Sequence, residues 1–168
     1  MKTFEHSHET FLALLAEHQR ALLKVCWVYG QTSHDRDDLL QEIISQLWAS
    51  FARYDPSRPF MTWMYRVALN VGIDSQRRQR RLREMGSLRD IPEAKTPSSG
   101  NPDRDELREL LEGKKEDDRA ILLLCLEGHS YREIGEVLGI SETNVGTRLN
   151  RLKQALRQSD EDAGDVGA

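Results

Sequence analysis

Apolar residues recur at the spacing of one helix face through most of the chain. Between residues 9 and 83 this pattern predicts consecutive helices, one of them amphipathic from about Asp35 to Tyr54. The next helix begins near Phe60 and is apolar almost all round, as expected for a helix in the middle of a bundle. No stretch shows the alternation of a half-buried strand, so the pattern predicts an all-α fold.

The composition changes after this first group of helices. Residues 84–103 include PEAKTPSSGNP, which is rich in proline, serine and glycine, so we expect a flexible linker. Residues 104–158 return to helical spacing and predict a second, smaller domain, whereas the acidic residues 159–168 are expected to be disordered. The 168 residues are therefore predicted to form two small helical domains, at residues 1–83 and 104–158.

The segment from Tyr131 to Leu152 has the pattern of a helix-turn-helix. Gly139 follows a short amphipathic stretch, where a sharp turn favours a residue that tolerates positive φ, and Ser141 can cap the next helix. Gly135 is expected to leave room where the two helices cross. The apolar positions of the second helix share one face: Val145, Leu149, Leu152 and Leu156.

Hydrogen-bonding side chains occupy the other side of this second helix. Thr143, Thr147 and Arg151 are predicted to point outward, with Asn144 and Arg148 on the flank. Such side chains suit base edges and phosphates in the major groove of DNA. The simpler interpretation is a helical hairpin that packs against another part of the protein. The segment alone leaves both interpretations open.

The net charge of −4 argues against nucleic-acid binding until its distribution is considered. Five arginines fall within residues 77–83, and residues 142–158 carry four basic residues and one acidic residue. By contrast, residues 84–118 hold eleven acidic and six basic residues. Two basic zones on an acidic chain predict weak DNA binding alone and stronger binding when a partner presents both zones together.

Catalytic and metal-binding motifs are absent from the sequence: it has no Gly-rich phosphate loop, HExxH or GxSxG. Cys26 and Cys125 are isolated within apolar patterns, which predicts two small core residues. We therefore expect a binding protein without enzymatic activity, cofactor or metal. No apolar run approaches the roughly 20 residues that span a bilayer, and the first residues do not resemble a signal peptide, so we expect a cytoplasmic protein.

Two further polar surfaces are predicted in the first domain. One lies opposite the apolar stripe of the helix around Asp38 and either docks on a partner or is simply solvated; it comprises Asp38, Gln41, Glu42, Ser45 and Ala49. The other is a stripe on the next helix, formed by Thr62, Arg66, Asn70 and Asp74, that leads towards the arginine cluster. Aromatic residues beside a dense arginine run suit single-stranded DNA. The alternatives are an internal salt-bridge ladder, with Asp74 pairing Arg78 or Arg66, and, for Trp63 and Tyr65, a place in the core.

Three of these segments resemble conserved regions of a known protein family. The segment DLLQEIISQLW, from Asp38 to Trp48, and the following FARYDPSRPFMTWMYRVALNVGIDSQRRQRR resemble the second conserved region of bacterial RNA polymerase sigma factors. The segment YREIGEVLGISETNVGTRLNRLKQALR resembles their fourth region. The short linker between them is similar to that of the extracytoplasmic-function subfamily.

The resemblance implies a sigma factor that binds core RNA polymerase and directs promoter-specific transcription initiation. It implies docking on the beta-prime clamp helices through Asp38, Leu39, Gln41, Glu42 and Trp48. It implies melting and capture of the minus-ten element through Trp63, Tyr65, Arg66, Asn70, Asp74, Arg77 and Arg78. It implies recognition of the minus-thirty-five duplex through Thr143, Asn144, Thr147, Arg148 and Arg151. The beta flap of the polymerase and an anti-sigma factor are further implied partners.

Two residues depart from the family pattern. Gly135 stands where the family usually has alanine, and Asn144 where threonine is frequent. These departures leave the base preference open. Two other classes of protein also remain compatible with the residues: a helix-turn-helix regulator that binds operators as a dimer without polymerase, and an adaptor whose helices bind only protein.

Overall fold

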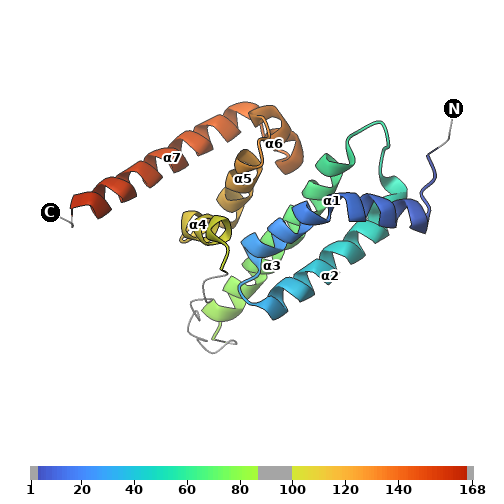
Figure 1. The fold of residues 1–168 in the computed structure, drawn as a ribbon, viewed down its shortest axis with the longest axis horizontal. Helices are drawn as coiled ribbons and strands as arrows, with labels where there is room; N and C mark the ends of the chain where they lie inside the picture. Colours follow the sequence, from blue (N-terminus) through green and yellow to red (C-terminus); the bar gives the residue numbers. More distant parts are fainter. Residues whose placement is uncertain (1–3, 87–99, 166–168) are drawn as a thin grey trace. The chain divides into compact units, whose positions relative to one another are not determined.

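The computed structural model describes residues 4–86 and 100–165, which form helices and no strand (Figure 1). The chain divides into two compact units, Met1–Pro97 and Ser98–Ala168. The prediction of an all-α protein with two small helical domains is confirmed. Most of the expected linker, residues 87–99, lies outside the described residues.

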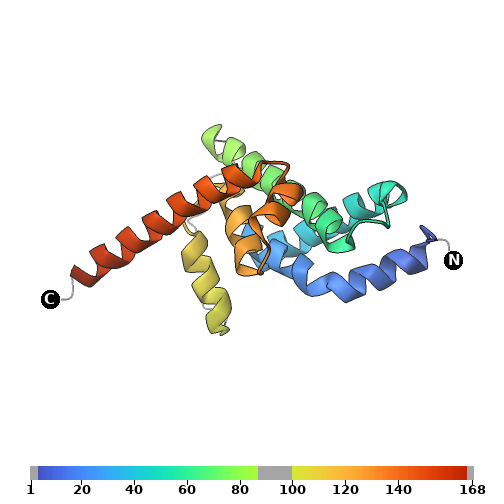
Figure 2. The same cartoon turned by 90° about the horizontal axis from the view of Figure 1, so that it is seen from above.

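In its described part, residues 4–86, the first unit is a bundle of three long helices. These are α1 (His8–Tyr29), α2 (Ser33–Ser50) and α3 (Phe60–Glu84), with one 3-10 turn, η1 (Phe51–Arg53), after α2. Each of the three helices contacts the other two, and Figures 1 and 2 show them running alongside one another. The bundle is closed by an apolar core drawn from all three, which includes Leu22, Val25, Leu39, Ile43, Leu47, Met64, Ala68 and Leu69.

Local side-chain contacts fix the helix ends in this unit. The hydroxyl of Ser7 accepts a hydrogen bond from the Thr10 amide at 3.2 Å and so caps α1. Thr32 and Asp35 form a capping box at the start of α2, each side chain accepting from the other's backbone N–H. Thr32 and Asp35 thus set the turn between α1 and α2.

The predicted helix that ends at Tyr54 is shorter in the structure. α2 ends at Ser50 and the chain passes through η1 before Tyr54. The reason is aromatic packing: the rings of Phe51 and Tyr54 are both buried and stack on each other at 6.0 Å. Trp63 packs against both of these rings, at 6.2 and 5.2 Å. This cluster of Phe51, Tyr54 and Trp63, called the aromatic cluster below, draws the chain away from the helical path.

Within residues 100–165, the second unit contains four helices: α4 (Pro102–Leu111), α5 (Glu116–Leu126), α6 (Tyr131–Leu138) and α7 (Glu142–Asp165). α5, α6 and α7 contact one another. Their shared core includes Ile121, Leu124, Ile134, Val145 and Leu149. This small core fixes the pair α6 and α7 on α5.

The expected disorder of residues 159–168 is wrong for most of that segment. α7 continues as a helix to Asp165, and the Ser159 hydroxyl donates to the Ala155 carbonyl at 3.0 Å. Extending an existing helix costs little, and no proline or glycine interrupts this segment before Gly164. The acidic residues are therefore attached to the same helix as the basic ones. Residues 166–168 lie outside the described part.

Gly72 on α3 is expected to be intolerant of alanine. A Cβ at this position would lie 2.6 Å from Cδ2 and 2.9 Å from Cγ of Tyr29, a buried ring of α1. We expect Gly72→Ala to lower the free energy of unfolding by about 1–3 kcal/mol, because overpacking outweighs the gain in helix propensity. Thermal unfolding followed by circular dichroism measures the change.

Gly146 on α7 provides the matched control. A Cβ there would lie 3.6 Å from the Tyr131 ring, which is an ordinary contact. Gly146→Ala is therefore expected to stabilise the protein by about 0.5–1 kcal/mol, because alanine favours the helix. Equal effects of the two substitutions would contradict the packing assigned to Gly72.

Candidate nucleic-acid interface

The turn between α6 and α7 has the geometry that the sequence predicts. Gly139 ends α6 in the left-handed region, at φ 69°. The hydroxyl of Ser141 accepts from the Asn144 amide at 3.1 Å and caps α7. Ser130 and Glu133 form a capping box at the start of α6, and the 2.7 Å hydrogen bond from the Ser130 amide lowers the pKa of the Glu133 carboxyl below its usual value. Both helices of the pair therefore start on a side-chain cap.

Gly135 allows the backbone of α6 and the backbone of the turn to approach each other closely. A Cβ at Gly135 would lie 2.6 Å from the carbonyl oxygen of Ile140, and the Ile140 amide donates to the Gly135 carbonyl at 3.1 Å. The room that we expected at a helix crossing is therefore used by the backbone of the turn. This contact fixes the path from α6 into α7.

α7 separates its apolar and polar side chains as predicted. Val145, Leu149 and Leu152 are buried, and Leu156 is half-buried. The expected outward residues are exposed on the other side: Thr143, Asn144, Thr147 and Arg151. We call this side the recognition face.

Asn150 also lies on the recognition face, although we did not single it out from the sequence. It is exposed and stands three residues after Thr147 and seven after Thr143, which places the three on one side of the helix. That spacing is the signal that identifies it. Its amide can both donate to and accept from a base edge.

Arg148 differs from the other residues that we expected to contact DNA. Its guanidinium donates to Oδ1 of Asp118 on α5 from Nε at 3.1 Å and from Nη2 at 2.7 Å. The two side chains are only 22% and 13% exposed. Arg148 is thus engaged inside the second unit and stands at the edge of the recognition face.

The polar stripe that the sequence predicts on α3, called the α3 stripe below, lies at the surface, with its first member Thr62 half-buried. Arg66, Asn70, Asp74 and Arg78 are exposed, and Arg77 is half-buried. Trp63 is half-buried in the aromatic cluster, and Tyr65 is 1% exposed, within the core of the bundle. The structure therefore brings together the charged and amide residues of the expected minus-ten set and places Tyr65 beneath them.

The polar side of α2 is also at the surface. Asp38 and Gln41 are exposed and Glu42 is half-buried, whereas Leu39 is 4% exposed and belongs to the core. Trp48 is 46% exposed, with its indole packed against Phe11 at 5.1 Å. We call Asp38, Gln41 and Glu42 the α2 acidic face.

An ion pair joins these two surfaces of the first unit. Nη2 of Arg78 on α3 lies 3.5 Å from Oε1 of Glu42 on α2. From the sequence, Arg78 was one of two candidate partners for Asp74, and in the structure Arg78 contacts Glu42 of α2. The α2 acidic face and the α3 stripe are therefore neighbouring parts of one surface.

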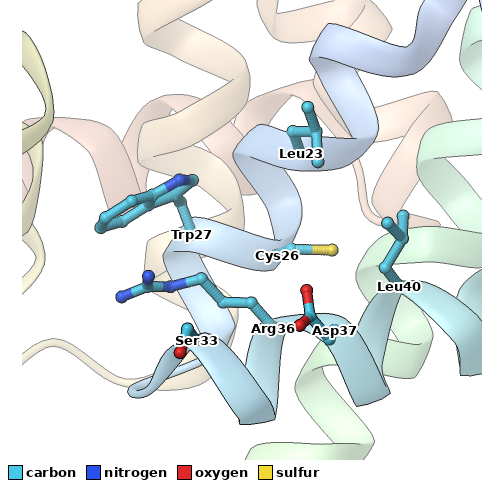
Figure 3. Close-up of a pocket in the computed structure, with 7 residues that line it drawn as sticks. All are labelled: Leu23, Cys26, Trp27, Ser33, Arg36, Asp37 and Leu40. Atoms are coloured by element: carbon cyan, nitrogen blue, oxygen red, sulfur yellow. The ribbon is translucent and has the colours of Figure 1, made fainter.

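A shallow pocket lies where the end of α1 meets the start of α2 (Figure 3). Its lining includes Cys26, Trp27, Arg36 and Asp37, and the Arg36 guanidinium stacks over the Trp27 ring at 3.6 Å. Burial raises the pKa of the Cys26 thiol to about 11. The thiol is therefore held neutral and is a poor nucleophile.

Cys26 is expected to react slowly with thiol reagents in the folded protein. At pH 8 a thiol with a pKa of about 11 is only about 0.1% thiolate, and its residue is 2% exposed. Cys125 is half-buried and is expected to be labelled first. Mass spectrometry after timed alkylation distinguishes the two sites, with unfolded protein as the control in which both react. Faster labelling of Cys26 would contradict its burial.

Other kinds of site find no support among the described residues. No group of three or more His, Cys, Asp or Glu side chains is arranged to hold a metal ion within residues 4–86 and 100–165. In the same part of the chain, no helix is both long and apolar enough to cross a membrane. The polar surfaces of α2, α3 and α7 remain the candidates for function.

Comparison with known proteins identifies both units. The family model described as Sigma-70 region 2 matches residues 14–82, and the one described as Sigma-70, region 4 matches residues 104–156. RNA polymerase sigma factor CarQ of Myxococcus xanthus is 33% identical over 73% of this chain and 72% of its own length. ECF RNA polymerase sigma factor SigE of Mycolicibacterium smegmatis is 29% identical over 86% of this chain, which spans 59% of the length of SigE.

Two solved structures share the fold. CnrH in complex with the cytosolic domain of CnrY matches 92% of this chain and 91% of its own, with 25% identity and a TM-score of 0.66. The sigma factor RpoE in complex with the anti-sigma factor NepR, from Bartonella quintana, matches 89% of this chain and 96% of its own, with 19% identity and a TM-score of 0.72. The likeness to RpoE concerns the fold alone.

Proposed function

Because this chain belongs to the extracytoplasmic-function subfamily of bacterial RNA polymerase sigma factors, we propose that it binds core RNA polymerase and directs it to promoters with two recognised elements. The observation that carries this proposal is the recognition face of α7 in a chain that also exposes the α2 acidic face and the α3 stripe. Neither an operator-binding regulator nor a protein-binding adaptor needs all three surfaces.

The second unit is proposed to bind the minus-thirty-five element as a duplex. α7 would lie in the major groove, with Thr143, Asn144, Thr147 and Arg151 towards base edges and phosphates. Asn150 joins this set because it is exposed on the same face. The same unit, residues 104–158, is proposed to contact the beta flap of the polymerase.

The first unit is proposed to hold the polymerase and to open the DNA. The α2 acidic face, with Trp48, would dock on the beta-prime clamp helices. The α3 stripe would capture the non-template strand of the minus-ten element, with phosphates neutralised by Arg66, Arg77 and Arg78. The proposed activity consists of binding and strand opening in the cytoplasm, without covalent chemistry, metal or cofactor.

An anti-sigma factor is proposed as a further partner. CnrH was solved with the cytosolic domain of CnrY and RpoE with the anti-sigma factor NepR. A protein of that kind would compete with polymerase for the same surfaces and keep this chain inactive. The inducing signal would then act on that partner.

Transcription from a randomised library tests the proposal. The purified protein is mixed with bacterial core RNA polymerase and a library of random promoter sequences, and the transcripts are sequenced. Defined start sites preceded by two enriched elements would support the proposal and yield the promoter sequence. If core polymerase is active with a known sigma factor but gives no transcripts with this folded protein, the proposal fails. Tight duplex binding by a dimer on a two-fold site would then favour the operator-binding regulator.

A further inference from the structure

The ion pair between Arg148 and Asp118 connects the helix that carries the recognition face to the helix beneath it. The two residues are 30 positions apart, on α7 and α5, and both guanidinium hydrogen bonds reach the same carboxylate oxygen, at 3.1 and 2.7 Å. Both side chains are largely buried. A charge-assisted pair that is shielded from water holds its geometry better than a surface pair does.

This contact leaves Arg148 poorly suited to read a base. An arginine that recognises guanine directs two N–H groups to O6 and N7 of the base. In Arg148 two N–H groups are already directed to Asp118, and the carboxylate neutralises its charge. Arg151, which is also an arginine and stands three positions later, is exposed on the recognition face.

The ion pair also supplies a directional restraint, which the apolar contacts of α7 lack. Val145 and Leu149 bury one side of the helix, but apolar contacts have no preferred direction and tolerate small rotations. A hydrogen-bonded ion pair has a preferred direction and fixes the helix about its own axis. Recognition requires side chains placed to within roughly 10–20°.

We propose that Arg148 is a positioning residue: held by Asp118, it sets the rotation of α7 and thereby aims Thr143, Thr147 and Arg151 at the minus-thirty-five element, without contacting bases itself. The inference rests on the proposed function. It differs from what the family resemblance implies for Arg148, which is a direct contact with DNA.

Asp118→Asn distinguishes a direct DNA contact of Arg148 from a positioning role, because the two roles predict opposite changes in the affinity for DNA. If Arg148 contacts DNA and Asp118 only competes for it, removing the acid frees a cation and tightens binding. If Arg148 positions α7, removing the acid weakens binding, although the protein has lost a negative charge. The measurement is the affinity of the reconstituted polymerase holoenzyme for a promoter selected from the random library.

We expect Asp118→Asn and Arg148→Gln each to weaken binding about tenfold, and the double variant to be no weaker than the single ones, because both remove the same contact. Arg148→Lys is expected to restore part of the affinity. The preferred base at every position of the element stays the same, and so does the dependence of binding on salt. Arg151→Gln, the matched control, reduces the salt slope by about one and relaxes the base preference at one position.

All affinities are compared at a temperature at which circular dichroism shows each variant fully folded, so that lost stability does not mimic lost positioning. Tighter or unchanged binding by Asp118→Asn, or a changed base preference in Arg148→Gln or Arg148→Lys, would overturn the inference. Failure of the proposed function is distinct, because it appears earlier as a library that yields no promoter.

Discussion

Core RNA polymerase is expected to lose at least about a hundredfold in affinity for this protein when Asp38 and Glu42 are both replaced by arginine. Both carboxylates belong to the α2 acidic face, with side chains 63% and 43% exposed. A partner surface that binds this face is expected to carry complementary positive charge, so reversing two charges turns attraction into repulsion, and each like-charge contact costs several kcal/mol. Titration of core polymerase with labelled protein measures the affinity directly.

The fold is expected to survive this double substitution. The buried side of α2 is formed by Leu39, Ile43 and Leu47, which the substitutions leave in place. Glu42 loses its ion pair with Arg78, a half-exposed contact that contributes little to stability. The control is the Glu5→Arg and Glu17→Arg double variant, which makes the same charge change at exposed positions elsewhere in the first unit. Equal affinity of the two double variants would remove the α2 acidic face from the proposed polymerase contact.

Open-complex formation is expected to fall by roughly 30-fold or more in the Arg66→Ala and Asn70→Ala double variant, since each contact to a displaced base or phosphate is worth about 1–3 kcal/mol. Both side chains are exposed on the α3 stripe one helical turn apart, so they can follow consecutive parts of a single strand. Permanganate reactivity of unpaired thymines in the selected promoter measures the opening.

Recruitment to the duplex is expected to stay nearly unchanged in this variant, because the recognition face lies in the other unit. A Gln19→Ala and Arg20→Ala double variant removes the same kinds of side chain from the exposed side of α1 and should open DNA normally. If the α3 variant opens the promoter as well as this control does, the stripe is not the site of strand capture.

Local chemistry made the helix-turn-helix predictable. Gly139 and Ser141 each act through neighbours a few residues away, by positive φ and by a cap, so their roles can be inferred from spacing alone. The apolar repeat of α7 similarly predicted which side is buried. The two-unit helical architecture was predictable too, because the helical spacing of apolar residues is a local property of the sequence.

Contacts between distant residues were not predictable in this way. Asp118 and Arg148 meet only because α5 packs on α7, and nothing in the spacing of the two residues indicates it. Leu39 and Tyr65 match a family motif by residue type, yet both are buried in the bundle. A motif specifies which side chain is present, whereas exposure depends on the helices that pack around it. The end of α2 at Ser50 likewise depends on the ring of Tyr54 meeting those of Phe51 and Trp63.

The distribution of tryptophans between the two units has an optical consequence. All three tryptophans of the chain, Trp27, Trp48 and Trp63, belong to the first unit, and the second unit has Tyr131 as its one aromatic residue of the Phe, Trp and Tyr types. In the isolated protein, tryptophan emission therefore reports on the first unit alone, without any label. Trp48 is half-exposed beside the α2 acidic face, so its emission responds when that surface is covered. In a titration of the isolated protein, a partner that lacks tryptophan and covers the α2 acidic face can thus be detected by its effect on this emission.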